Sequence, residues 1–197
     1  LVISFMGSDV LGLNDSKGNF TLKGKFIAFC NRWFHRFFFH FIIVKSDEMA
    51  GKFKGCASQL AVIPNGVDMR DFSIIEMDAG FEKTNFSRSH RHILFVSDPS
   101  RNEKNFSLAK AATDALGYDD MILSTVYNLP ISELKYYYSI ADVVLMTSFH
   151  EGSPNVIKEA MASNCNVVCT DVGDVKDTFG ELPNCWITGQ DVNSVVV

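Results

Sequence analysis

The residues best suited to chemistry lie in one short run, SFHEGSPNVIKEAMA at positions 148–162. Gly152 lets the backbone turn tightly and approach a ligand closely. Ser153 is a residue type favoured at the N-cap of a helix, and Pro154 suits the first helical position. A helix that starts here offers free backbone N–H groups and the positive end of its dipole. The run therefore predicts a phosphate site at a helix start.

Two carboxylates flank this helix start. Glu151 lies in the loop before it, and Glu159 lies about one turn inside, on the same helical face as Asn155. Ile157 and Ala160 lie on another face, which suits the core. A sugar attached to a diphosphate presents hydroxyl groups on both sides of such a site. From spacing alone, a solvated loop carboxylate and an exposed helical glutamate are the more common outcomes, because so short a pattern is weakly specific.

Strands alternate with helices along the chain. Short apolar runs predict strands at 1–5, 41–44, 61–63, 92–96, 121–126, 142–146, 166–169 and 185–187. Helical patterns, with Ser46 and Ser132 as expected caps, fall at 26–40, 47–53, 104–116, 132–140, 154–163 and 175–179. The alternation indicates an α/β fold with a parallel sheet and helices on both faces. Ligands bind such sheets at the carboxyl ends of the strands, where the run 148–162 begins.

Composition limits the class of protein. The 197 residues are 47% hydrophobic and 21% charged, with a net charge of −5, which excludes a disordered or collagen-like chain and argues against general nucleic-acid binding. The five cysteines form no C-x-x-C pair and are expected to be reduced core residues of a cytosolic protein. No carboxylate, His or Cys cluster has the spacing of a metal site.

The most apolar stretch, residues 33–44, is too short and too interrupted to cross a bilayer, which takes about 20 apolar residues. We expect its aromatic residues to form one face of a buried helix. A membrane-surface face is less favoured, because this stretch lacks a polar side rich in Lys and Arg. A strong turn signal, PNGVD at 64–68, precedes a polar stretch, and together they predict a domain boundary at about residues 64–90.

The run EGSPNVIKEAMASNCNVVCTDVGDV, residues 151–175, closely resembles the donor-site signature of the retaining glycosyltransferases of family 4, also called group 1. It carries their paired glutamates as Glu151 and Glu159. Four further stretches resemble the same family: residues 3–12, 44–53, 62–72 and 93–112. The likeness implies a GT-B fold, in which two Rossmann-like domains enclose the active site between them.

The resemblance also implies a domain plan. Residues 1–64 would be the tail of the N-terminal acceptor-side domain, 65–90 the boundary, and 91–197 a C-terminal nucleotide-sugar-binding domain. Because the family's proteins are longer, we expect an internal fragment, incomplete at both ends, that binds nucleotide and is inactive in transfer when alone.

By the resemblance, Glu159 would bind the ribose hydroxyls and Glu151 would contact the donor sugar near the reaction centre. Lys104 would neutralise the diphosphate, with Arg101 as the available substitute for an arginine that the family places earlier in that loop. The backbone that holds sugar and phosphate would be that of Gly152, Ser153, Pro154 and Asn155.

Further positions fit the resemblance less closely. Asp9 resembles an acceptor-side residue, although Met6 stands where many members have histidine. His150 is expected to be a loop histidine, with a place in the lining of the pocket as the alternative. Asp171, Gly173 and Asp174 suggest a loop near the donor phosphates.

The resemblance thus implies a hexosyltransferase that moves a sugar, with retention, from a nucleoside-diphosphate sugar to a glycan or lipid-linked saccharide. No cofactor, metal or nucleic acid is implied. The location would be cytoplasmic, with peripheral contact at the inner face of the membrane left open, as are the donor base and the oligomeric state. The alternatives are a non-catalytic nucleotide-binding fragment and a nucleotide-sugar 2-epimerase of the same fold.

Overall fold

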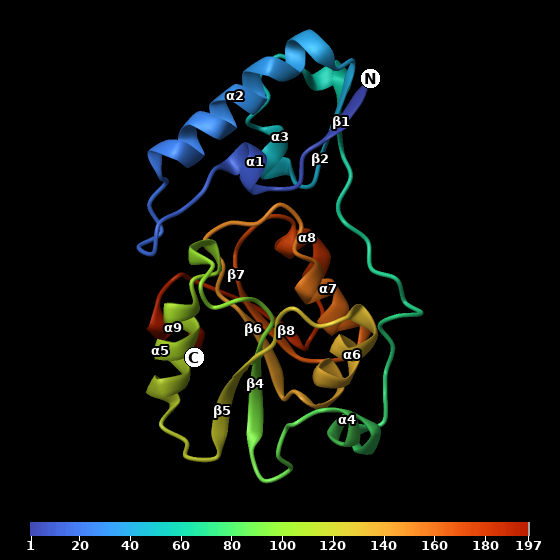
Figure 1. Ribbon diagram of the computed structural model, residues 1–197, viewed down its shortest axis with the longest axis vertical. Coiled ribbons are helices and arrows are strands. Elements are labelled where there is room, and N and C mark those ends of the chain that lie inside the picture. Colours follow the sequence, from blue (N-terminus) through green and yellow to red (C-terminus); the bar gives the residue numbers. More distant parts are fainter. Residues whose placement is uncertain (197) are drawn as a thin grey trace.

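Two parallel sheets, joined by a long connecting segment, make up the computed structural model, which describes residues 1–196 apart from the side chains at positions 36 and 57 (Figure 1). The first sheet has the order β1-β2-β3, with β1 Val2–Ser4, β2 Phe41–Val44 and β3 Leu60–Val62. The second has the order β5-β4-β6-β7-β8, with β4 Arg91–Phe95, β5 Met121–Thr125, β6 Val143–Met146, β7 Val167–Thr170 and β8 Cys185–Thr188. Every strand pair is parallel, as the alternating pattern predicts.

The helices lie between these strands in sequence. The first part contains α1 Ser8–Leu11, α2 Leu22–Phe38, α3 Asp47–Ala50 and the 3-10 helix Ala57–Gln59. The second contains α4 Met77–Lys83, the 3-10 helix Asn102–Lys104, α5 Phe106–Leu116, α6 Ile131–Ile140, α7 Asn155–Ala162, α8 Val175–Phe179 and α9 Val192–Val196.

Helices cover both faces of the five-stranded sheet. Successive residues of a strand point to opposite faces, so Leu94 and Val144 pack with α6, α7 and α8, whereas Ile93 and Leu145 pack with α5 and α9. Figure 1 shows these helix groups on the two sides of the sheet. This three-layer arrangement confirms the predicted α/β class.

The smaller sheet has its own core. Ile42 and Val44 of the central strand β2 are almost fully buried, and Val10 and Met49 pack against them from α1 and α3. The boundary at about residues 64–90 stays a prediction, and in the structure this segment connects β3 to β4. That residues 1–64 belong to an acceptor-side domain stays a prediction.

Helix starts differ from the sequence-based expectation. α2 begins at Leu22 and not at Phe26, because the Thr21 side chain accepts a hydrogen bond from the Gly24 N–H and caps the helix there. The expected cap at Ser132 is wrong, since α6 begins after Pro130 without a side-chain cap. The cap expected at Ser46 is present, with its hydroxyl accepting from the Met49 N–H. Helices α1, α4 and α9 are short and were not predicted.

The aromatic residues of α2 do not form a buried face, contrary to expectation. Phe29, Trp33 and Phe37 are 60%, 48% and 63% exposed. The buried positions of the helix are instead Gly24, with Ala28 and His35. Periodicity places residues on one face, but it does not say which face the rest of the protein covers.

All five cysteines are free. Cys56, Cys165 and Cys169 are buried, as expected of small core residues, and burial raises the pKa of the Cys165 thiol to about 12. Cys30 and Cys185 are half-buried.

Ile157 of α7 is fully buried against the five-stranded sheet and provides a test of this packing. Ile157→Ala should lower the free energy of unfolding by about 2–5 kcal/mol through lost burial and the cavity left behind. Urea denaturation measures the change. Ile131→Ala, at a position that is 56% exposed in α6, is the control and should cost about 0.5 kcal/mol or less. Equal losses in the two variants would contradict the packing described.

Candidate functional site

The loop between β6 and α7, residues 147–154, lies at the carboxyl edge of the five-stranded sheet. The Thr147 hydroxyl donates to the backbone carbonyls of Lys104 and Asn105, at 3.1 and 2.9 Å, and so ties this loop to the one after β4. The Thr170 hydroxyl, at the end of β7, donates to the Ser148 carbonyl at 2.7 Å. Three adjacent strand ends are thereby held together at the edge where ligands bind such sheets.

Glu151 and Lys104, predicted as sugar and diphosphate contacts, lie directly against each other. The Lys104 ammonium donates to Glu151 Oε1 at 2.5 Å, and the Ser148 hydroxyl donates to the same oxygen at 2.7 Å. Both charged side chains are only 16% exposed. A pair this shielded from water is stronger than a surface ion pair, so Glu151 is not a solvated loop carboxylate.

Arg101 brings a second cation to the same region. Its guanidinium donates to Glu103 Oε1, and the side chain is 56% exposed. Arg101 and Lys104 both line a cavity of about 370 Å³ beside the ends of β4 and β5, whose walls include Asp98, Tyr127 and Val156. The wall of this cavity therefore carries two cations, each paired with a glutamate, and one carboxylate, Asp98.

Glu159 is half-buried in α7. Its Oε2 accepts a hydrogen bond of 2.8 Å from the hydroxyl of Tyr138, which is almost fully buried. Burial raises the pKa of the Glu159 carboxyl, and the Tyr138 hydrogen bond opposes that rise. Burial and the neighbouring Glu159 also raise the pKa of Tyr138 well above its ordinary value. The hydrogen bond from Tyr138 thus fixes the position of the Glu159 carboxylate.

Ser153 does not cap α7, contrary to expectation. Pro154 occupies the N-cap position, and no side chain caps the helix. The Ser153 hydroxyl instead donates to Asp174 Oδ2 at 2.8 Å and accepts from the Asn65 N–H at 2.9 Å and from the Lys158 ammonium at 2.5 Å. Its partners hold it in a polar network, so it cannot reach the first helical N–H groups.

Lys158 and Asp174 complete that network. The Lys158 ammonium also donates to Asp174 Oδ2 at 2.6 Å and to the Asn65 carbonyl at 2.8 Å. The two charged side chains are 10% and 4% exposed. We call Asn65, Ser153, Lys158 and Asp174 the anchoring network, because they join the connecting segment, α7 and the loop after β7. Asp171, predicted near phosphates together with Asp174, pairs with Lys176 at the surface.

Gly152 lies in close contact with two other segments. A Cβ at this position would overlap the Met6 carbonyl oxygen, from the loop after β1, and would touch the Met49 sulfur. Gly173 has a φ of +60°, and a Cβ there would lie 2.7 Å from the Gly152 carbonyl oxygen and 3.0 Å from that of Glu151. Both positions therefore require glycine. At Gly152 the closely approaching group is the backbone of another segment of the protein, whereas the sequence suggested a ligand.

A second cavity, of about 320 Å³, lies between the loop after β1 and the loop before α7. Asp9, Arg101, His150 and Glu151 are among its lining residues. The Asp9 carboxylate accepts hydrogen bonds from the N–H groups of Met6 and Gly7. His150 lies in a loop, as expected, but it is 7% exposed, and burial lowers its pKa. Glu151, which pairs with Lys104, therefore lines this cavity together with residues of the first part of the chain.

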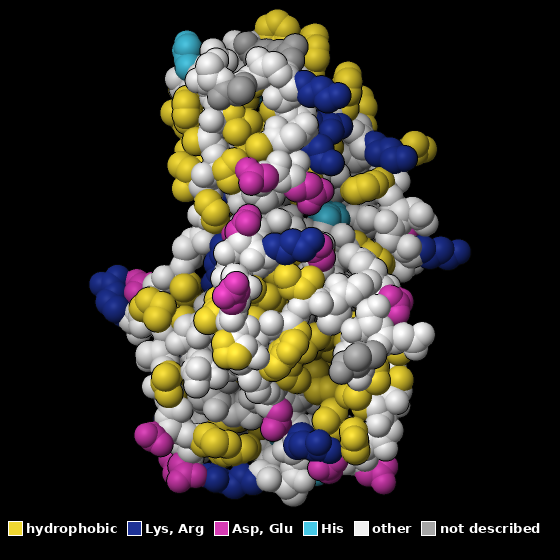
Figure 2. All heavy atoms as spheres, turned by 180° about the vertical axis from the view of Figure 1, so that it is seen from behind, with side chains coloured by type: hydrophobic (Ala, Val, Ile, Leu, Met, Phe, Trp, Pro, Cys, Tyr) yellow, Lys and Arg dark blue, Asp and Glu magenta, His cyan; other side chains and the backbone are white. Residues whose placement is uncertain are grey.

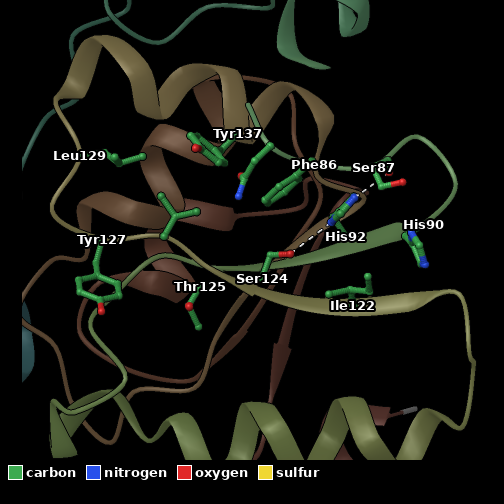
Figure 3. Close-up of a pocket in the computed structure, with 12 residues that line it drawn as sticks. Phe86, Ser87, His90, His92, Ile122, Ser124, Thr125, Tyr127, Leu129 and Tyr137 are labelled. Carbon is green, nitrogen blue, oxygen red and sulfur yellow. Dashed lines mark hydrogen bonds between the residues drawn. The ribbon is translucent and has the colours of Figure 1, made fainter. Parts of the chain in front are cut away.

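A third cavity, of about 470 Å³, lies beside β5 and α6 (Figure 3). His92 points into it, stacked on Phe86, and bonds to the Ser124 hydroxyl and the Ser87 carbonyl. These internal hydrogen bonds already occupy both nitrogens of the His92 ring, and the lining residues include no Lys, Arg, Asp or Glu. It is therefore a poorer site for a charged ligand than the cavity at Lys104.

Sequence reasoning missed several of these residues. Tyr138, Asn65 and Lys158 carry no local signal, because their partners lie between 5 and 93 residues away in the chain. Lys158 reads as an exposed helical lysine, and only its nearness to Asp174 in the fold shows otherwise. Within residues 1–196, no group of three or more His, Cys, Asp and Glu side chains is arranged to hold a metal ion. No helix in that range has the length and apolarity to cross a membrane.

Comparison with known proteins gives a family match. The family described as "Glycosyl transferases group 1" matches residues 88–196. A stretch of 53 residues is 40% identical to "Putative teichuronic acid biosynthesis glycosyltransferase TuaC" of Bacillus subtilis, and it covers 27% of this chain and 14% of that protein.

Solved structures show the same fold. Anabaena Alr3699/HepE, in complex with UDP and glucose, has a TM-score of 0.75 and 17% identity, over 100% of this chain and 60% of that one. Sucrose-phosphate synthase from Thermosynechococcus elongatus has a TM-score of 0.67 and 20% identity, over 79% of this chain and 47% of that one. The chain spans less than two thirds of the length of each of these proteins.

The raised pKa of Glu159 gives a pH test. A carboxyl whose pKa is raised on folding binds a proton more tightly in the folded chain, so its charge destabilises the fold at neutral pH. That cost is relieved as the pH falls through the folded-state pKa. We expect the free energy of unfolding of Glu159→Gln to exceed that of the unmodified protein at neutral pH. This difference should disappear as the pH falls to about 4.

Urea unfolding at both pH values measures this difference. Glu133→Gln, in the exposed first turn of α6, is the matched control for the loss of one helical carboxylate. A Glu159→Gln advantage that grows as the pH falls would contradict the assigned cause.

Proposed function

The chain belongs to the group 1 glycosyl transferases, and from that premise we propose that it forms the donor-binding part of a transferase. The enzyme would move a hexose-type sugar from a nucleoside-diphosphate sugar to a glycan or lipid-linked saccharide, with retention of configuration. The observation that carries the proposal is the shielded Lys104–Glu151 pair at the carboxyl edge of the sheet, beside the start of α7. It lies between the two cavities at that edge.

The nucleotide would lie in the cavity of about 370 Å³. Lys104 and Arg101 are the cations on its wall, and the start of α7 adds backbone N–H groups and a positive dipole end. Glu159, fixed by Tyr138, is the carboxylate proposed to accept hydrogen bonds from the ribose hydroxyls. The cations would thus bind the negatively charged diphosphate, and the carboxylate would accept hydrogen bonds from the hydroxyls of the sugar.

The transferred sugar would extend toward the cavity of about 320 Å³, where Glu151 faces the loop after β1. Negative charge develops on the diphosphate as it leaves, and a fixed cation stabilises it most effectively where water is excluded. Glu151 holds Lys104 in place at 2.5 Å, so the ammonium is already positioned when the charge develops. In a front-face retaining reaction, the leaving phosphate would take the acceptor proton, and no side-chain base is then required.

Two observations on relatives support the choice of donor. The Alr3699/HepE structures are described as complexes with UDP, with UDP and glucose, and with UDP-glucose. The curated relative is named for teichuronic acid biosynthesis. We therefore propose a uracil nucleotide as the first donor to test, and cell-surface polysaccharide assembly as the setting.

Product analysis separates this proposal from its alternatives. A transferase consumes donor only when an acceptor is present, whereas a 2-epimerase converts the free donor. A nucleotide-binding fragment binds the donor but neither transfers nor epimerises its sugar.

Removing the proposed ribose contact should weaken nucleotide binding. Glu159→Ala is expected to lower the affinity for UDP by about 5- to 150-fold, because one charged hydrogen-bond acceptor is lost. Calorimetric titration with UDP, GDP and ADP measures this effect and identifies the base. Glu133→Ala, an exposed glutamate on α6, is the matched control and should bind as the unmodified chain does. No binding by a chain that is folded by circular dichroism would contradict the proposed donor site.

Lys104 should act on the phosphates and not on the nucleoside. Lys104→Gln is expected to weaken UDP binding roughly tenfold or more, since a charge-assisted contact to the diphosphate is lost. It should leave the weaker binding of uridine unchanged. Lys110→Gln, on the exposed side of α5, controls for the loss of one positive charge. Equal losses for UDP and uridine would show that Lys104 acts by holding the fold together.

A further inference from the structure

The connecting segment, residues 63–76, is attached to the second part of the chain at two points. It runs from β3 to α4, and most of its residues are exposed (Figure 1). Asn65 is half-buried against the start of α7, and Phe72 is 4% exposed. Between them the segment projects from the side of the molecule, where Arg70 pairs with Asp68, and Figure 2 shows a basic and an acidic side chain together at this edge. Such a segment depends on its attachments, because fixing an exposed backbone costs conformational entropy.

Asn65 contacts the start of α7 through three hydrogen bonds. Its backbone N–H donates to the Ser153 hydroxyl and its side-chain amide donates to the Ser153 carbonyl, both at 2.9 Å. Its own carbonyl accepts from the Lys158 ammonium at 2.8 Å. An alanine at this position would lose the side-chain bond and keep the two backbone bonds. The first attachment thus fixes the backbone at which the phosphates are proposed to bind.

Phe72 contacts the other end of the donor site through a buried tyrosine. Its ring packs edge-on against Tyr138, with the ring centroids 5.9 Å apart and the planes at 67°. Tyr138 is 1% exposed, and its hydroxyl donates to Glu159 Oε2 at 2.8 Å. A smaller side chain at position 72 would leave space beside Tyr138, into which the tyrosine ring could shift. The position of the Glu159 carboxylate therefore depends on Phe72.

We propose that Asn65 and Phe72 are positioning residues of the donor site, and that nucleotide binding is linked to the attachment of the connecting segment. Asn65 holds the start of α7 for the diphosphate, and Phe72 holds Glu159, through Tyr138, for the ribose. Detachment of the segment and loosening of the site are then the same event. Nucleotide must in turn strengthen the attachment, because such linkage is reciprocal. This inference rests on the proposed function for the identity of the ligand.

Removing the Asn65 side chain should affect the phosphates and not the nucleoside. Asn65→Ala is expected to weaken UDP binding about two- to tenfold, because one hydrogen bond that orders the start of α7 is lost. The weaker binding of uridine should stay as in the unmodified chain. Asn166→Ala is the matched control, because it removes the amide bond to the Asp142 carbonyl just before β7, at the other end of the strand. It should leave the binding of both ligands unchanged.

Reducing the Phe72 side chain should affect the nucleoside as well. Phe72→Leu is expected to weaken UDP and uridine binding by the same factor, about two- to tenfold, because the carboxylate proposed to bind the ribose is displaced. In a Glu159→Ala background the same substitution should have no further effect, since Phe72 acts through that carboxylate. Phe179→Leu, at another buried phenylalanine of the same core, is the control for lost packing. Calorimetric titration measures all of these affinities.

Hydrogen exchange, followed by mass spectrometry of peptides, tests the attachment itself. In the free chain, Asn65→Ala should speed exchange in α7 as well as in residues 63–72, whereas Asn166→Ala should change neither. In the unmodified chain, UDP should slow exchange in residues 63–72. The described lining of the proposed nucleotide cavity includes none of these residues, so direct contact with the nucleotide does not account for such protection.

The outcomes separate this inference from the proposed function. If UDP binds the unmodified chain, and Asn65→Ala and Phe72→Leu bind it as well as their controls do, the inference is overturned and the donor site stands. Exchange in α7 that Asn65→Ala leaves unchanged would also overturn it, as would equal losses for UDP and uridine in that variant. No UDP binding by the folded chain, together with faster exchange in α7 of Asn65→Ala, would contradict the proposed function and confirm the attachment.

Discussion

The buried ion pair between Lys158 and Asp174 is the interaction on which the arrangement of the site depends. The two charges lie 2.6 Å apart, and both are almost shielded from water. A buried charge that loses its partner costs about 3–5 kcal/mol, so the pair strongly resists separation. The Ser153 hydroxyl also donates to Asp174. The Asn65 backbone donates to that hydroxyl and accepts from Lys158. The start of α7, the loop after β7 and the connecting segment are therefore fixed to one another.

The position of the candidate site follows from this constraint. With the start of α7 fixed, Gly152 lies against the Met6 carbonyl, and Glu151 faces both the loop after β1 and Lys104. One turn further, Glu159 lies over Tyr138. Lys104 borders the cavity of about 370 Å³ and Glu151 borders the one of about 320 Å³, so their ion pair joins the walls of the two cavities. This geometry suits a ligand with a nucleotide at one end and a sugar at the other.

The strands and the site loop could be predicted from the sequence because local patterns encode them. The apolar runs of β2 and β6 and the glycine, proline and glutamates of residues 151–159 are readable without long-range contacts. The role of Ser153 could not be predicted, since its partners Asp174 and Asn65 lie 21 and 88 residues away. The aromatic residues of α2 were predicted to be buried for a related reason. Their periodicity defines a face, but only the packing of Gly24 and Ala28 shows that the opposite face is covered.

The central claim is that a nucleoside diphosphate binds at the start of α7, and a crystal structure of the chain with UDP tests it most directly. We predict that the ribose hydroxyls lie within hydrogen-bond distance of the Glu159 carboxylate and that the diphosphate contacts Lys104. UDP bound instead in the cavity at His92, or with its ribose away from Glu159, would contradict the account.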